Sequence, residues 1–309
     1  MCYVNRAPVV KSNCQYFREV VKERRFALTD KIVVVYKLIR LVLLIFLTCE
    51  YSLALASTQS PFNKGWELYQ KGDFGGALAK WKPLADKGDA RAQFNLGVMY
   101  DEGRGVLQSR EDAVLWWKKA AKSGNPHAKH NLGLAYLSGD GVERNFKLAM
   151  TWFREAAVQG MNRSQYSLGK IYGAGLGNVL QDDEESFAWI SKAAKSGFDR
   201  AQYNLGKMFR DGKGVRKDRE LAVKWFRAAA EQGYAKAQRN LGNQYLVGDG
   251  VRQDNTRAYF WLTLAADAAI SGAAKNRDLA ATKLTKGERH LIEIQVRNWQ
   301  PKPANQVLR

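Results

Sequence analysis

One phrase of about fifteen residues recurs five times and constrains the fold of this chain more than any other feature. Its first copy reads AQFNLGVMYDEGRGV. The copies begin at Ala92, Ala128, Ser164, Ala201 and Ala237, with a spacing of 36 residues and one of 37 after the third copy. A catalytic motif normally occurs once, whereas recurrence at a fixed period is typical of a stacked structural unit.

Each copy contains two helical patterns. Ala92, Leu96 and Tyr100 lie on one face of a helix, because residues four apart sit above one another. The second half, EDAVLWWKKAAKSG in the first copy, places Ala and Trp at helical spacing and ends on Gly124. We expect the recurring tryptophan to pack against the small Ala and Gly residues of a neighbouring helix. It occurs at Trp116, Trp152, Trp189, Trp225 and Trp261.

Glycines mark the middle and the end of each first half. Gly97 and its equivalents interrupt a helix at a cost of roughly 1 kcal/mol each, which close approach to another helix would explain. The pair Gly103 and Gly105 suits positive-φ turns after a helix end, and Val106 would anchor the turn in the core. Each copy is therefore predicted to be a helix–turn–helix hairpin that buries its apolar stripe by stacking, which makes the chain an all-α solenoid.

The pattern A-x-x-x-L-G-x-x-Y-x-x-G-x-G-V, followed by A-x-x-W-x-x-x-A-A-x-x-G, is similar to the Sel-one-like repeat, a relative of the tetratricopeptide repeat. Departures are local: Ser164 and Ser186 replace Ala, Phe209 replaces Tyr, and the third loop is irregular. The five predicted repeats span 90–125, 126–161, 162–198, 199–234 and 235–270.

The resemblance implies a right-handed α/α superhelix that serves as a non-catalytic protein-interaction scaffold. Bacterial members are often exported. Some secreted members with a disulfide in each repeat bind or hydrolyse β-lactams, but the repeats here contain no cysteine, so that activity is not expected.

The flanking segments complete a solenoid of about six hairpins. Residues 57–89 resemble a degenerate tetratricopeptide-like hairpin that lacks the long glycine turn. Residues 271–309 are predicted to form one or two capping helices and a tail, since the last hairpin would otherwise expose its apolar face. The residues expected on the capping face are Leu279, Leu284, Leu291, Ile294 and Trp299.

Residues 1–56 form an N-terminal prefix followed by a predicted signal peptide over 31–56. Basic residues precede an apolar run from Leu41 to Leu47, and Ala54-Leu55-Ala56 matches a cleavage site after Ala56. The apolar run is shorter than the ~20 residues that a membrane span needs, which disfavours an uncleaved anchor. A lipoprotein site at Cys49 lacks a good lipobox, and a start near Ile32–Val35 would explain the long polar prefix. The prediction is a periplasmic or secreted protein without a stable membrane span.

Charge points to acidic partners. Residues 1–56 hold nine basic and four acidic side chains, so the rest of the chain has 40 basic and 26 acidic side chains, a net charge of +14. Such an excess suits an acidic protein, an anionic glycan or lipopolysaccharide, and a solvated basic face is the alternative. Nucleic acid is disfavoured because the aromatic residues follow the core spacing instead of forming an exposed platform.

No catalytic, cofactor or metal site emerges from the sequence. All three cysteines lie in the segment that would be removed. His127 and His130 could share a helix face but lack a third ligand nearby. The acidic run Asp182–Glu185 suits a helix N-terminus. The chain is therefore predicted to be no enzyme, to need no cofactor, and to act as a monomer.

The concave groove lined by the first helices is the predicted binding surface. An asparagine recurs beside the apolar stripe, and it either forms an amide ladder for a partner backbone or bonds to the adjacent repeat. Residues that vary on the same surface would set specificity. The predicted partner-binding residues are Asn95, Asn131, Asn204, Asn240, Met99, Lys170, Lys207 and Gln244. The leading hypothesis is a protein adaptor in the bacterial envelope or outside the cell, and the alternative is a binder of anionic glycan.

Overall fold

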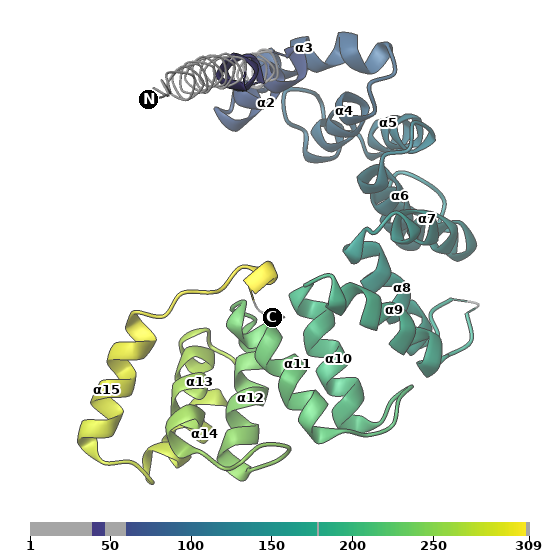
Figure 1. Cartoon of the computed structure of the whole chain (residues 1–309). Coiled ribbons are helices and arrows are strands. Elements are labelled where there is room, and N and C mark those ends of the chain that lie inside the picture. Colours follow the sequence, from purple (N-terminus) through teal and green to yellow (C-terminus); the bar gives the residue numbers. More distant parts are fainter. Residues whose placement is uncertain (1–38, 47–59, 178, 307–309) are drawn as a thin grey trace, which may run out of the picture. The chain divides into compact units, whose positions relative to one another are not determined.

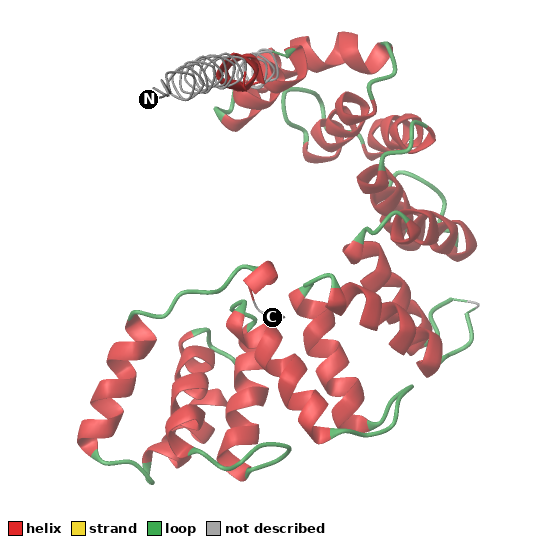
Figure 2. Ribbon diagram, in the orientation of Figure 1, coloured by secondary structure: helices red, strands yellow, loops and turns green. Residues whose placement is uncertain are grey.

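The computed structural model describes residues 39–46, 60–177 and 179–306, and all regular structure in them is helical (Figure 2). The chain forms two compact units, Met1–Gly72 and Asp73–Arg309. In the first unit, residues 39–46 are helical and α2 (Pro61–Gln70) is capped by the Ser60 side chain. The rest of the predicted signal peptide, with its cleavage site at Ala56, lies outside the described residues. None of the described helices has the length and apolarity that a bilayer crossing requires.

The second unit is a series of helices in which each packs on the next along the chain, except that the last two both pack on the helix that precedes them (Figure 1). The first helices of the five repeats are α4 (Ala90–Glu102), α6 (Pro126–Ser138), α8 (Asn162–Ala174), α10 (Asp199–Asp211) and α12 (Ala235–Val247). The second helices are α5 (Arg110–Lys122), α7 (Phe146–Val158), α9 (Asp183–Lys195), α11 (Arg219–Glu231) and α13 (Asn255–Asp267). Before them comes α3 (Phe74–Asp86), and after them α14 (Ala273–Ala281), α15 (Lys286–Arg297) and η1 (Ala304–Gln306). The predicted all-α solenoid is confirmed.

Local sequence signals set the helix ends. Each second helix begins at a side-chain cap that accepts a backbone N–H from its first turn, which satisfies one of the free donors of a helix start. The caps are Ser109, Asn145, Asp182, Asp218 and Asp254. The acidic run at Asp182 is therefore a helix start, as predicted. Each first helix ends at a left-handed glycine, such as Gly103 with φ of 66°.

The mid-helix glycine allows close packing within each hairpin, but the partner side chain differs from the prediction. Gly97 faces Trp117, and not the recurring Trp116. Trp116 lies one residue earlier on α5, where Lys119 Nζ sits 3.9 Å from its ring centroid. One residue corresponds to a large rotation about a helix, so the two tryptophans point to different faces. In the other repeats the glycine faces Phe153, Ile190, Phe226 or Leu262.

The second glycine of each loop brings successive repeats together. The backbone of Gly214 lies so close to the carbonyl of Asp183, at the start of α9, that no Cβ would fit between them. Gly141 and Gly250 lie in the same way against Arg110 and Arg219. Every such loop therefore packs on the second helix of the preceding repeat. The valine that follows is half-buried beside the core, as predicted for the turn anchors Val142, Val215 and Val251.

A buried glutamine, for which the repeat pattern predicted no role, also joins neighbouring repeats. Gln202 Nε2 donates to the carbonyl oxygen of Ala194 at 3.3 Å, and its Oε1 accepts from Gln232 Nε2 at 2.7 Å. The amides of Gln93, Gln165 and Gln238 make the same bond to Ala85, Ala157 and Ala230. A carbonyl near the C-terminus of α3, α7, α9 and α11 thus gains a donor from the next repeat. In the second repeat Lys129 replaces the glutamine and pairs with Glu155 at 3.0 Å.

The C-terminal cap uses a different face from the one predicted. Ala280 and Ile292 are buried against the last repeats, and Leu284 packs beside them. Leu279 and Leu291, which were expected on the capping face, are exposed. Ile294 is also exposed, whereas Trp299 packs edge-on against Trp261 with ring centroids 6.3 Å apart. Leu291 and Ile292 are adjacent, and a step of one residue is enough to change the buried face, because successive side chains are rotated about the helix axis.

Candidate functional site

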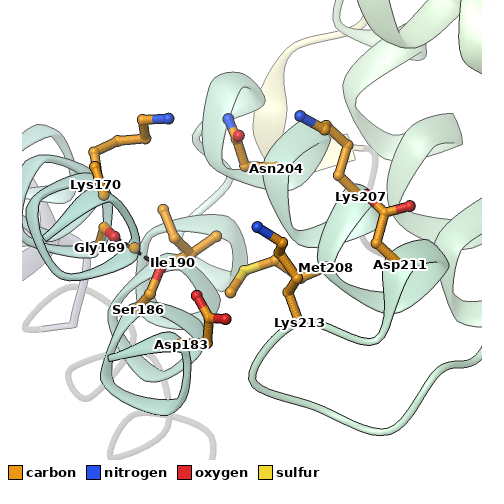
Figure 3. Close-up of a pocket in the computed structure, with 12 residues that line it drawn as sticks. Gly169, Lys170, Asp183, Ser186, Ile190, Asn204, Lys207, Met208, Asp211 and Lys213 are labelled. Atoms are coloured by element: carbon orange, nitrogen blue, oxygen red, sulfur yellow. Dashed lines mark hydrogen bonds between the residues drawn. The ribbon is translucent and has the colours of Figure 1, made fainter. Parts of the chain in front are cut away.

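A pocket between the third and fourth repeats brings together three of the predicted binding residues. Lys170 comes from α8, and Asn204 and Lys207 come from α10. Figure 3 shows the two lysine side chains reaching toward Asn204 from either side. The pocket has a volume of about 180 Å³, and Ser186 and Ile190 of α9 lie at its base. Three of the predicted residues therefore lie together at one pocket, and their role in partner binding stays a prediction.

Asn204 connects the two repeats that form this pocket. Its Nδ2 donates to the hydroxyl of Tyr166 on α8 at 3.1 Å and to the carbonyl oxygen of Arg200 at 2.8 Å. Burial raises the pKa of the Tyr166 hydroxyl, which therefore stays neutral at physiological pH. Here the asparagine has the stacking role that was one of its two predicted roles, and its amide nitrogen is already bonded.

The charges around the pocket leave a positive excess. Lys170, Lys207 and Lys213 line it together with Asp183 and Asp211. Arg210 bonds Asp211 at 2.7 and 2.9 Å, and this hydrogen bond is the main cause that holds the pKa of that carboxyl below its usual value. No ion pair joins the three lysines to a carboxylate within the described residues. The pocket therefore suits a carboxylate or another anionic group of a ligand.

Two further residues of the pocket, Ser186 and Lys213, differ from the residues at the same positions of other repeats. Ser186 stands where other repeats have Ala, and its buried hydroxyl donates to the carbonyl oxygen of Gly169 at 2.7 Å. A buried polar group is tolerated when it is bonded in this way. Lys213 comes from the glycine loop, for which the sequence pattern predicted only a turn. The register of the repeats could have identified it, since Asp140 and Asp249 hold the same loop position and also line pockets.

The same pocket recurs at two other repeat junctions. Between repeats one and two it has a volume of about 260 Å³, contains Asn131 and Leu134, and is crossed by an Arg110–Asp140 ion pair at 2.6 Å. Between repeats four and five it has a volume of about 370 Å³ and contains Asn240 and Gln244. Corresponding positions on α6, α10 and α12 thus line a series of three pockets that differ in charge and size.

Asn95 and Met99 line none of these three pockets. Met99 is fully buried, with 0% of its surface exposed, so its proposed contact with a partner is wrong. It belongs to the core because it lies on the inward side of α4, next to the Leu96 stripe. Asn95 has a buried Nδ2 without a hydrogen-bond partner among the described residues.

Gln244 occupies an apolar position of the repeat. It is only 5% exposed, and neither amide atom bonds to any described group. Met99, Ala135, Ile171 and Met208 hold the equivalent positions, and all are buried. An unpaired buried amide costs free energy, so Gln244 is expected to lower the stability of the fold.

Replacing Gln244 by methionine is expected to raise the free energy of unfolding by about 1–2 kcal/mol, because a buried amide without partners is removed. Gln202→Met is the matched control: it is equally buried but has both atoms bonded, so it should lower stability by about 1–3 kcal/mol. Urea denaturation of the two variants measures both values. Destabilisation by both substitutions would show that the Gln244 amide is satisfied in solution.

The two histidines considered as metal ligands do not form a site. The His127 ring packs on Phe94 at 5.6 Å, whereas His130 is buried with its Nδ1 2.8 Å from Ser164 Oγ. No group of three or more metal-ligating side chains gathers anywhere in the described segments.

Comparison with known proteins supplies the family. The Sel1 repeat model matches residues 90–125, 126–161, 162–198, 199–234 and 235–269. A solved Sel1 repeat protein from Oxalobacter formigenes is 30% identical, with a TM-score of 0.67, over 77% of this chain and 100% of that chain. No match was found among curated proteins.

Two further solved structures are more distant. A protective antigen of uropathogenic Escherichia coli strains with an SLR fold is 25% identical, with a TM-score of 0.34, over 82% of this chain and 72% of that chain. An immunity protein from Pseudomonas aeruginosa is 18% identical, with a TM-score of 0.44, over 66% of this chain and 81% of that chain. The five matched repeats cover more than half of the residues, and they show that this chain belongs to the Sel1 repeat family.

Proposed function

We propose that the chain is a non-catalytic adaptor that binds an extended, acidic protein segment along the pockets of its first helices. Sel1 repeat proteins are generally protein-interaction scaffolds and generally not enzymes. The observation that carries the proposal is the repetition of one pocket at three repeat junctions. A linear segment can contact such pockets in succession, and their differing side chains then select its sequence.

The charge of the central pocket supports an acidic ligand. Lys170 and Lys207 flank Asn204 from opposite sides, and a carboxylate between them would accept hydrogen bonds from both ammonium groups (Figure 3). The signal-peptide pattern of residues 31–56 supports an action in the bacterial envelope or outside the cell. A monomeric adaptor is the simplest form, because the groove is built from one chain.

The proposal is tested by capture of partners from a bacterial envelope extract on the immobilised full chain. The double variant Lys170→Glu/Lys207→Glu is expected to reduce the captured protein at least tenfold at moderate salt. Lys80→Glu/Lys224→Glu is the matched control, since it makes the same charge change at exposed positions of α3 and α11. Capture by the control should stay within twofold of the wild type.

The alternative function, binding of anionic glycan or lipopolysaccharide through the general basic surface, predicts a different pattern. Both double variants would then lose binding equally, and the amount of material captured by the wild type would fall steeply as the salt concentration rises. The net charge of +14 on residues 57–309 is the observation that favours this alternative. Undiminished capture of a protein by the Lys170→Glu/Lys207→Glu variant would contradict the pocket proposal.

A further inference from the structure

The C-terminal tail shows how an extended segment binds to a second surface, away from the pockets of the first helices. After α15 the chain runs back along the turns that follow the second helices (Figure 1). A Cβ added to Gly233 would lie 3.3 Å from Pro301, and one added to Gly197 would lie 2.8 Å from the Cβ of Ala304. The tail therefore passes from the turn after α11 to the turn after α9, and it advances one repeat between Pro301 and Ala304.

Backbone and charge both contribute to this contact. The N–H of Lys302 donates to the carbonyl oxygen of Glu231 at 2.8 Å, and its Nζ lies 3.2 Å from the Glu231 carboxylate. Glu231 is the last residue of α11, where helix carbonyls have no partner within the helix. The tail thus supplies a donor to a free carbonyl, as a bound peptide would. Three extended residues reach about 10 Å, which is adequate for one repeat step.

The turns after α5 and α7 have the same backbone geometry, but no described segment of the chain covers them. Gly124 and Gly160 have φ of 87° and 86°, close to 86° for Gly197 and 92° for Gly233. All four turns carry the same hydrogen bond, from the glycine N–H to an alanine carbonyl three residues earlier. A Cβ added to Gly124 or Gly160 would meet no atom of the described residues within 4 Å, in contrast to the turns under the tail.

The side chains beside the uncovered turns define what would bind there. The positions equivalent to Glu231 are Lys122 on α5 and Val158 on α7. Val158 is 78% exposed, and Lys122 is exposed and joined to no carboxylate in the described part of the chain. Among the described residues, no donor bonds the carbonyl of either one. This pair of turns thus offers two free acceptors, one apolar contact and one cation.

We propose that the turns at Gly124 and Gly160 form a second docking surface, for an extended partner segment of the type Pro-apolar-Pro-Ala-acidic. The register follows the tail. The first proline takes the place of Pro301 over Gly160, the apolar residue lies over Val158, and the alanine takes the place of Ala304 over Gly124. The acidic residue then meets Lys122, as Lys302 meets Glu231 with the charges reversed. This surface is independent of the pockets assigned to the proposed function.

The test uses two fluorescent peptides and the full chain. One peptide carries residues 298–306 (NWQPKPANQ), and the other carries the same residues with Lys302→Leu and Asn305→Glu (NWQPLPAEQ). Fluorescence anisotropy is expected to show at least tenfold tighter binding of the second peptide, because only that peptide complements Val158 and Lys122.

Lys122→Glu in the protein should weaken binding of NWQPLPAEQ at least tenfold. Lys195→Glu is the matched control, since Lys195 holds the equivalent position on α9, whose turn is already covered by Ala304. Its effect should stay below twofold, and both variants should keep the wild-type melting temperature. Equal loss with both variants, or no difference between the two peptides, would overturn the proposal. Lys170→Glu/Lys207→Glu should leave this binding unchanged, so failure of one proposal leaves the other intact.

Discussion

Replacing Gly214 by alanine is expected to lower the free energy of unfolding by roughly 3–4 kcal/mol, as the sum of a left-handed backbone penalty and a steric clash. Gly214 has φ of 66°, and its α-carbon faces the carbonyl of Asp183 in the preceding repeat. That carbonyl belongs to the first residue of α9, so it can move only if the helix start moves. The loop and the third repeat would therefore separate.

Gly212→Ala measures the backbone part of this effect, so the difference between the two variants is the steric part. Gly212 lies in the same loop with φ of 73°, but the nearest atom to an added Cβ would be 3.5 Å away. Gly212→Ala should lower the free energy of unfolding by about 1 kcal/mol, from the left-handed backbone penalty alone. Urea denaturation measures both, and the Gly214 variant should also broaden the transition, because a solenoid with one weak junction unfolds in parts. Equal losses of unfolding free energy in the two variants would show that the loop does not pack tightly against the preceding repeat.

The sequence was sufficient for the fold because each fold signal appears five times. Alanine, leucine and glycine recur at fixed positions, so accidental patterns are averaged out and the helix–turn–helix unit is unambiguous. Finer assignments failed where one residue of rotation decides the outcome. Trp116 and Trp117 are adjacent, and periodicity alone did not show which of them faces Gly97. The buried face of the cap was predicted wrongly because one residue of rotation also decides it, and the cap has no second copy for comparison.

The candidate site could be predicted only in part. Lys170, Asn204 and Lys207 come from the helix face that the repeat pattern identifies, and they do line one pocket. Lys213 and Asp183 belong to a loop and to another helix, and their position depends on how one repeat stacks on the next. Stacking geometry is set by contacts between repeats, such as the Gln202–Ala194 hydrogen bond. Such contacts join residues that periodicity within one repeat does not relate.

Two departures from the repeat pattern compensate for one another in space. His130 stands where the first and third repeats have Phe94 and Tyr166, and Ser164 stands where the others have alanine. The structure places His130 Nδ1 2.8 Å from Ser164 Oγ, and both residues are buried. A buried imidazole and a buried hydroxyl each need a partner, and here each serves the other. Either substitution alone would leave a polar atom without a hydrogen bond.

This pair should make the stability of the chain depend on pH. Burial is the main cause that lowers the pKa of His130 to about 4, from 6.5, and the charges of Arg163 and His127 lower it further. In the unfolded chain His130 therefore binds a proton near pH 6.5, whereas in the folded chain it binds one only near pH 4. The free energy of unfolding is therefore not reduced by His130 above pH 6.5, and it decreases as the pH falls toward 4, by at most about 3 kcal/mol.

The double variant His130→Phe/Ser164→Ala restores the residues of the other repeats and should remove this pH dependence. Urea denaturation at pH 7.0 and 4.5 measures the difference, and the wild type should lose more stability between these values than the variant by about 2 kcal/mol or more. His290→Gln changes an exposed histidine on α15 and should keep the wild-type profile. Equal losses in the wild type and the double variant would mean that the junction opens enough for water to reach His130. In that case the interface between repeats two and three would be looser than its contacts indicate, and the rigid stacking on which the series of pockets depends would fail at this point.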